Sequence, residues 1–302
     1  AIAATAVALG SVMWYQHMYG EWPFLESLSA NLADEGLHPP AYPWEHFKWF
    51  KTFDHAAIRR GFQVYQEVCS TCHSLDRIAW RNLVGVSHTV DEVKAMAADV
   101  EYEDGPNDDG EMFQRPGKLS DYLPSPYPNE EAARAGNAGA LPPDLSLITR
   151  VRGSDWVFTY LKSFYLDETR PLGWNNQLFP NVSMPNPLWE LQGLQRPVYG
   201  APDEIGQPVV ESLQQAQPGR LSEADFDRAV RDITAFLEYA AEPAALKRQG
   251  IGVWVIFFLA FFLDFFELSF IVVPLLGPIT AGLQAMASRT TANESEFDTN
   301  SV

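Results

Sequence analysis

The sequence predicts a mostly α-helical domain followed by one C-terminal transmembrane helix. Three observations support this fold class. Apolar residues recur at helical spacing in several segments that begin with a capping residue. No convincing run of alternating strand residues appears, and an uncharged, almost wholly apolar run covers residues 251–263. The 302 residues are enough for one large domain or two ordinary ones.

The composition excludes several classes of protein. Asp and Glu number 39 and Lys and Arg number 21, which leaves a formal net charge of −18 at pH 7. A nucleic-acid-binding protein needs a basic surface, so we expect no nucleic-acid partner. An acidic surface instead suits a basic protein, whose approach it would accelerate at low salt. Cys69 and Cys72 are the two cysteines, which excludes a disulfide-rich scaffold and a four-cysteine metal site built from this chain alone.

Two helices are predicted after an irregular, aromatic-rich lead-in over residues 16–50. Asp54 can cap the first helix, and Thr89 with Glu92 has the spacing of a capping box for the second. The first helix carries four residues on neighbouring turns, namely Ile58, Phe62, Tyr65 and Cys69. The second carries Val93, Met96 and Val100. The acidic stretch at 101–111 is rich in carboxylates and turn residues and predicts a solvated loop.

Three more helices are predicted in the second half of the domain. One short helix starts at Asn129 and another after Ser154, through WVFTYLKSFY. Residues 165–220 are rich in Pro, Gly, Gln and Asn and predict long loops. The last helix is the clearest, because Ser222 and Asp225 suit its start and the apolar residues that follow keep helical spacing. These residues are Phe226, Val230, Ile233, Leu237 and Ala240.

Both ends of the chain are apolar. Residues 1–15 carry no charge, and we expect the remnant of an export signal, the tip of an anchor or an ordinary buried terminus. The apolar run at 251–263 is shorter than the ~20 residues that span a bilayer. From residue 251 to residue 277, however, the chain is long enough to span with tilt, interrupted only by Asp264 and Glu267. The alternative is a buried helix of a soluble core.

The segment Cys69-Ser70-Thr71-Cys72-His73 carries the chemistry. C-x-x-C-H is the attachment signal for c-type haem. Two thiols three positions apart on one helical turn can add to the two vinyl groups of a haem, and His73 then supplies an axial nitrogen. A redox dithiol would need a thioredoxin-like βαβ context, and a zinc site would need two more ligands, for which His88 is the nearby candidate. One motif predicts one covalently attached haem c.

A low-spin electron-transfer haem usually takes a second axial ligand, and a methionine thioether is a common one that raises the reduction potential. Among six methionines, Met184 is favoured because it lies in the stiff stretch FPNVSMPNP, well downstream of the cysteines. Met96 has the spacing of a core residue, and Met112 follows the acidic stretch. Met184 could instead fill a gap in the core.

Three stretches of the chain resemble the cytochrome c1 family, the haem subunits of the cytochrome bc1 complex, respiratory complex III. They are IRRGFQVYQEVCSTCHSLDRIAWRNLVGVSHT at 58–89, RPGKLSDYLPSPYPNEEAARAGNAGALPPDLSLITR at 115–150 and GWNNQLFPNVSMPNPLWELQG at 173–193. The resemblance implies a class I c-type cytochrome domain with long loop insertions and a C-terminal transmembrane helix. It divides the chain into a lead-in at 1–44 that can include a signal remnant, a c-type haem domain at 45–246, a transmembrane anchor at 247–277 and a tail of unknown role at 278–302.

The same resemblance assigns site residues. It implies that Cys69 and Cys72 bind the haem and that His73 and Met184 are its axial ligands. Arg152 falls where the family has an arginine near a haem propionate, a role that suits a guanidinium. Four further residues fall where the family lines the haem pocket or places an aromatic ring beside it, and these are Asn137, Pro142, Pro143 and Trp156. The acidic stretch at 101–111 resembles the segment that the family uses to dock cytochrome c.

The resemblance implies a membrane-anchored monohaem cytochrome that passes single electrons from a Rieske iron–sulfur protein to a soluble, basic cytochrome c. Quinol oxidation would occur on cytochrome b, and this chain would itself make and break no bonds. We expect a dimeric complex in an inner membrane, with the haem domain on the periplasmic or the intermembrane-space side. Two alternatives stay open: a monohaem carrier that feeds a terminal oxidase, and a haem sensor or small-molecule binder with an open axial position.

Overall fold

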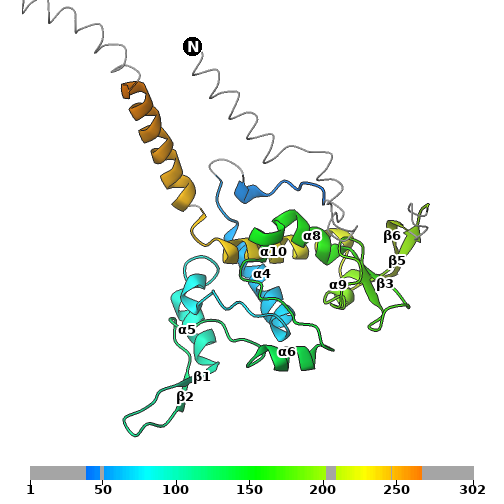
Figure 1. The fold of residues 1–302 in the computed structure, drawn as a ribbon, viewed down its shortest axis with the longest axis horizontal. Helices are drawn as coiled ribbons and strands as arrows, with labels where there is room; N and C mark the ends of the chain where they lie inside the picture. The colour runs from blue at the N-terminus through cyan, green and yellow to red at the C-terminus, as the bar shows by residue number, and fades with distance from the viewer. Residues whose placement is uncertain (1–38, 48–50, 202–208, 246, 267–302) are drawn as a thin grey trace, which may run out of the picture. The chain divides into compact units, whose positions relative to one another are not determined.

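The computed structural model describes residues 39–47, 51–201, 209–245 and 247–266. The chain separates into two compact units, Ala1–Pro243 and Ala244–Val302. Helices α4 (His55–Glu67) and α10 (Glu223–Ala241) lie against each other in the first unit (Figure 1), and α7 (Ile148–Arg152) and α8 (Ser154–Lys162) also pack on α10. The core around them contains fully buried side chains that include Ile58, Leu75, Leu83, Phe158, Phe164 and Phe236.

Four predicted helices begin at the predicted caps. They are α4, α5 (Val90–Ala98), α6 (Glu130–Gly136) and α10. The side chains of Asp54, Thr89, Asn129 and Ser222 accept hydrogen bonds from backbone N–H groups in the first turns. The capping box of Thr89 and Glu92 is present as well. The predicted helix after Ser154 is α8, which ends at Lys162 because the next residues form a strand.

A glycine brings α4 and α10 close together. A Cβ added to Gly61 would lie 2.0 Å from the backbone oxygen of Asp232 on α10, so only a residue without a side chain fits there. Arg60, the preceding residue, binds the buried Asp232 carboxylate with two hydrogen bonds of 2.5 and 3.0 Å. The two helices are therefore joined by tight backbone packing and by a bidentate ion pair at the same point.

Helix α4 ends earlier than predicted. Its last residue is Glu67, Val68 leaves the helical region with φ −121° and ψ −61°, and Cys69–Thr71 form a separate 3-10 helix, η2. The backbone N–H groups of Cys72 and His73 donate to the Cys69 carbonyl at 3.2 and 2.9 Å. The prediction that both thiols share one turn is confirmed, but the assignment of Cys69 to the first helix is wrong.

The described residues contain three antiparallel two-stranded sheets that the sequence analysis did not predict. β1 (Glu101–Asp104) pairs with β2 (Phe113–Pro116), β3 (Phe164–Leu166) with β4 (Trp174–Asn176), and β5 (Gly193–Tyr199) with β6 (Val210–Pro218). The predicted loop at 101–111 therefore begins with a strand, and the predicted loops at 165–220 contain four strands and the short helix α9 (Trp189–Gln192). Short 3-10 helices at Glu45–Phe47 and Trp80–Leu83 were also missed. The mostly α prediction holds only in part.

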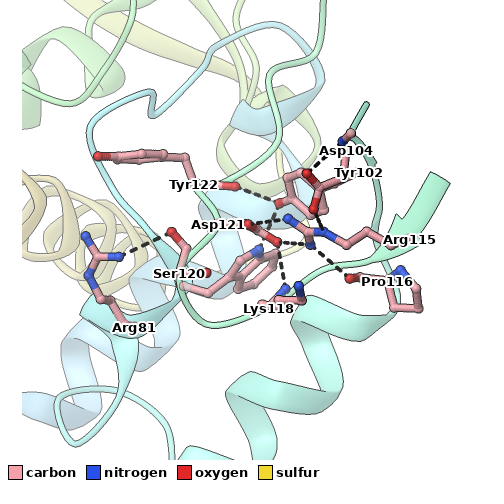
Figure 2. Close-up of polar contacts among 11 residues, drawn as sticks. Arg81, Tyr102, Asp104, Arg115, Pro116, Lys118, Ser120, Asp121 and Tyr122 are labelled. Carbon is pink, nitrogen blue, oxygen red and sulfur yellow. Dashed lines mark hydrogen bonds and ion pairs between the residues drawn. The ribbon is translucent and has the colours of Figure 1, made fainter. Parts of the chain in front are cut away.

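Arg115 anchors the β1–β2 hairpin at its base (Figure 2). Its guanidinium donates to the Asp121 carboxylate at 2.6 and 3.0 Å and also binds the Asp104 carboxylate. These contacts hold the pKa of Asp121 at about 2, below its usual value. Beside them the Tyr102 hydroxyl donates to the Tyr122 carbonyl at 2.6 Å. These contacts tie the hairpin to the segment that follows it.

Among its described residues, the second unit contains one helix that is long and apolar enough to cross a membrane. It covers Lys247–Phe266, and none of this span is buried within the chain. Large apolar side chains such as Trp254, Phe257 and Phe261 are exposed along it. The predicted continuation to residue 277, the apolar residues 1–15 and the tail at 278–302 lie outside the described residues.

Candidate functional site

The His73 ring is held in one tautomer. Its Nδ1 atom lies 2.7 Å from the carbonyl oxygen of Pro143. A carbonyl oxygen can only accept, so Nδ1 carries the hydrogen and donates it. Burial lowers the pKa of His73, and the Pro143 hydrogen bond and the Asp144 charge oppose this only in part. The ring is therefore neutral at pH 7, and its Nε2 lone pair remains available for a metal.

Asp144 holds the Pro143 segment against the turn that follows the histidine. One carboxylate oxygen accepts from the Ser74 hydroxyl at 2.9 Å and from the backbone N–H of Asp76 at 2.8 Å. The other oxygen accepts from the backbone N–H of Ser146 at 2.9 Å. Ser74 and Asp76 follow His73 in the chain, whereas Ser146 follows Pro143. The carboxylate therefore joins the two segments and fixes the position of the Pro143 carbonyl relative to the His73 ring.

The two cysteines of the motif are free thiols and are half-buried. Burial, with a smaller contribution from Cys72, raises the pKa of Cys69 to about 12, so this thiol is protonated at neutral pH. The hydroxyl of Tyr65 on α4 donates to the His73 carbonyl at 3.1 Å and ties the motif to the helical core. Two reduced thiols beside an available imidazole nitrogen are the groups that covalent haem attachment requires.

The Met184 sulfur accepts a hydrogen bond from Tyr160. The hydroxyl oxygen lies 3.3 Å from the sulfur. The Tyr160 ring stacks on Trp156, with centroids 4.8 Å apart and an interplanar angle of 11°. It also meets the edge of Phe164 at 5.1 Å. The predicted ligand and the predicted aromatic residue thus belong to one cluster, which we call the methionine cluster and define as Arg152, Trp156, Tyr160, Phe179 and Met184.

Buried asparagines hold the chain that leads to Met184. Asn176 is 0% exposed, and its side-chain oxygen accepts from the backbone N–H groups of Leu178 and Phe179 at 2.9 and 3.0 Å. Its amide nitrogen donates to the Tyr160 carbonyl at 2.8 Å. Asn175 accepts from the backbone N–H of Asn181 at 2.8 Å. The loop is therefore positioned by side-chain hydrogen bonds as well as by its prolines.

Arg152 is the last residue of α7, and its guanidinium lies over aromatic rings. The guanidinium carbon is 5.2 Å from the Trp156 ring centroid and 5.9 Å from that of Phe179. The side chain is exposed. Stacking of this kind orients a guanidinium without using its N–H groups, which can then bind a carboxylate.

The remaining predicted residues have different surroundings. The Asn137 amide closes the end of α6 by donating to the Ala133 carbonyl at 2.7 Å and to the Tyr127 hydroxyl at 3.0 Å. Pro142 is half-buried, and Pro143 contributes its carbonyl to His73. His88, the nearby candidate for a zinc ligand, is half-buried with its ring against Phe62 at 5.4 Å.

Three residues of the site were missed in the sequence. Tyr160 lies four residues after Trp156, so the two share a helix face, and this spacing could have paired them. Asp144 lies two residues before Ser146, which is the spacing of an Asx turn. Tyr65 has the helical spacing of the first predicted helix, and nothing in that spacing indicates the hydrogen bond to the motif.

The donor set fits a c-type haem in chemical type. The described residues supply two thiols, an imidazole with an available Nε2, a thioether and an oriented guanidinium. These are the groups needed for two thioether bonds, two axial ligands and one propionate contact.

The chain is similar to known proteins over most of its length. The model of the Cytochrome C1 family matches residues 44–270. The chain is 46% identical over 258 residues to the mitochondrial cytochrome c1 heme protein of Neurospora crassa, covering 85% of this chain and 71% of that protein. It is 48% identical over 234 residues to the mitochondrial cytochrome b-c1 complex catalytic subunit of Candida albicans, with 76% of each chain covered. Identity to the Saccharomyces cerevisiae cytochrome c1 heme protein is 42% over 261 residues, covering 86% and 79%.

Proposed function

The chain belongs to the Cytochrome C1 family, and from that premise we propose that it is the haem-bearing electron-transfer subunit of the cytochrome bc1 complex. It takes single electrons from a Rieske iron–sulfur protein and passes them to a soluble, basic cytochrome c. The observation that carries this proposal is the hydrogen bond from His73 Nδ1 to the Pro143 carbonyl, which leaves Nε2 for iron.

The protein's own groups hold the cofactor and tune it. Cys69 and Cys72 would hold one haem c through two thioether bonds, and His73 and Met184 would supply the ligands to its iron. When bound, haem supplies an iron that exchanges one electron between Fe(II) and Fe(III). Arg152 would bind a propionate, since its guanidinium is already oriented by the rings of the methionine cluster. During electron transfer no side chain of this chain would make or break a covalent bond.

The C-terminal helix anchors the haem domain in an inner membrane. The helix at Lys247–Phe266 is long and apolar enough to cross a bilayer. We propose the haem domain at 45–246 and the anchor at 247–277, with the haem domain on the periplasmic or intermembrane-space side. The relatives named above are mitochondrial proteins, which is consistent with an inner membrane.

Cytochrome b and the Rieske protein are the proposed membrane partners, in a dimeric complex. Support comes from the Candida albicans relative, which is named as a subunit of the cytochrome b-c1 complex. Quinol oxidation is assigned to cytochrome b. The acidic β1–β2 hairpin supports a basic cytochrome c as the electron acceptor.

The test is isolation of the full chain from its native membranes under mild detergent. We expect cytochrome b and a Rieske protein to copurify, and we expect the haem to stay with the chain on a denaturing gel. Replacing both Cys69 and Cys72 with Ala should abolish that covalent retention. Copurification with a terminal oxidase instead would support the carrier alternative, and release of free haem from the wild type would contradict attachment.

A pair of methionine variants tests the ligand assignment. Met184→Leu keeps the side-chain volume nearly constant and removes the sulfur, so the weak red absorption band of methionine–iron ligation should disappear and the reduction potential should fall. Met96→Leu, a half-buried methionine on α5, is the matched control and should change neither. An unchanged band in Met184→Leu would mean that another residue, or none, holds the sixth position.

A further inference from the structure

The sulfur of Met184 meets a hydroxyl group that is fixed in place. Tyr160 stacks on Trp156, meets the edge of Phe164 and has its backbone carbonyl bound by the buried Asn176 amide at 2.8 Å. Its hydroxyl oxygen lies 3.3 Å from the sulfur. A thioether sulfur has no hydrogen to donate, so the Tyr160 hydroxyl is the donor of this hydrogen bond.

A thioether sulfur has two lone pairs and can use them separately. One lone pair can bind iron while the other accepts a hydrogen bond, although sulfur is a weak acceptor. We infer that Tyr160 is a positioning residue for the axial thioether, which it orients toward the iron and whose electron donation it weakens, raising the haem reduction potential. This inference rests on the proposed function, which makes Met184 the axial ligand.

The direction of the effect follows from the charge of the iron. A hydrogen bond from Tyr160 draws electron density away from the Met184 sulfur. Fe(III) is more electron-poor than Fe(II) and depends more on donation from its ligands, so the hydrogen bond disfavours the oxidised state relative to the reduced state. Hydrogen bonds to ligand atoms are among the means by which a protein sets a haem potential.

Tyr160→Phe in the full-length holoprotein, kept in its native membranes, tests the inference. The variant keeps the stacking on Trp156 and removes only the hydroxyl. At a fixed ambient potential the ratio of reduced to oxidised haem should fall about two- to five-fold, the effect of one modest hydrogen bond. A tenfold fall would correspond to about 59 mV for a one-electron couple. The red methionine–iron band should shift in wavelength without disappearing.

Tyr165→Phe is the matched control. Tyr165 is a buried tyrosine five residues further along the chain, on strand β3, which pairs with β4. Removing its hydroxyl should leave the haem ratio and the red band unchanged. An equal change in both variants would overturn the inference, because loss of any buried hydroxyl would then explain the result.

A double-mutant cycle separates this inference from the proposed function. In a Met184→Leu background the acceptor sulfur is gone, so Tyr160→Phe should no longer change the haem ratio. The same change in both backgrounds would show that Tyr160 acts by another route and would overturn the inference. If Met184→Leu abolishes the red band but Tyr160→Phe has no effect in the native background, the inference fails and the proposed function stands. If Met184→Leu itself changes nothing, the ligand assignment fails, and the inference with it.

Discussion

The side chain of His73 is oriented by groups that lie far from it in the sequence. The Pro143 carbonyl selects its tautomer, and Asp144 holds that carbonyl in place through Ser74, Asp76 and Ser146. A carboxylate that accepts several hydrogen bonds at one point can fix two segments at once. The position of the imidazole thus depends on a residue 71 positions further along the chain that does not itself contact the ring nitrogen.

Replacing Asp144 with Ala should destabilise the domain and loosen the His73 ring. Three donors lose their acceptor, and we expect the free energy of unfolding to fall by about 2–3 kcal/mol. Denaturant unfolding of the holoprotein, followed by haem absorbance, measures this. Asp76→Ala is the control, since Asp76 contributes its backbone N–H to the network and should cost less than about 0.5 kcal/mol. Equal losses would mean that the Asp144 carboxylate does not have this role.

The C-x-x-C-H motif can be recognised in the sequence because its residues are local. Cys69, Cys72 and His73 are neighbours, so their spacing carries the whole signal. The contact between Tyr160 and Met184 joins residues 24 apart, and the one between Ser74 and Asp144 joins residues 70 apart. Pairs at such separations leave no periodic pattern in the chain, because the fold alone brings them together.

Helices and strands differed in how well the sequence indicated them. The helix starts were predictable because a cap and its N–H partners lie within three residues of each other, as at Asp54 and Ser222. Strands β1, β2 and β6 were missed because they have no buried residue along their length, and β3 and β4 because each is only three residues long. A strand with no buried face needs no alternation of apolar and polar residues. The η2 break before Cys69 likewise has no residue signal such as Gly or Pro.

The contact between α4 and α10 leaves no room for a side chain at position 61. Gly61→Ala places a methyl group within 2.0 Å of the Asp232 carbonyl and 2.8 Å of the Phe236 Cβ, so the helices must move apart. We expect a loss of about 1–3 kcal/mol, typical of overpacking. Thermal unfolding of the full-length protein in detergent measures it. Gly250→Ala, a helical position with nothing within 4 Å of the added atom, should leave the transition unchanged. Equal transitions for the two variants would contradict close packing at Gly61.

The chain combines an acidic haem domain with an exposed apolar helix. The two compact units divide at Pro243, and the candidate span begins at Lys247. Ending the chain at residue 246 should release a soluble domain that retains its haem, because the apolar surface of the span is removed. Fractionation of membranes after a salt wash decides the outcome, with the full-length chain as the control. A truncated protein that stays bound would indicate a second anchor, either residues 1–15 or a partner subunit.

The net charge of −18 attracts a basic partner most strongly where carboxylates are concentrated on the surface. The β1–β2 hairpin and its turn present five exposed carboxylates, and these are Glu101, Glu103, Asp108, Asp109 and Glu111. Asp104, the last residue of β1 before the turn, belongs to the same stretch but is paired with Arg115. Arg115 also binds Asp121, so its ion pairs tie this charged segment to the residues that follow the hairpin.

Neutralising the five exposed carboxylates to Asn or Gln, and leaving Asp104 in place, should slow association with a basic cytochrome c several-fold at low ionic strength. Rim charges act mainly on the association rate and are screened by salt, with a Debye length of about 8 Å at physiological strength, so the salt dependence should also flatten. Stopped-flow oxidation across a salt series measures both, and the haem spectrum should not change. Neutralising Glu130 and Glu131, exposed on α6, is the matched control for lost charge. If the wild type and the hairpin variant give the same salt slope while the α6 variant flattens it, steering belongs to α6 and the docking role of the hairpin is wrong.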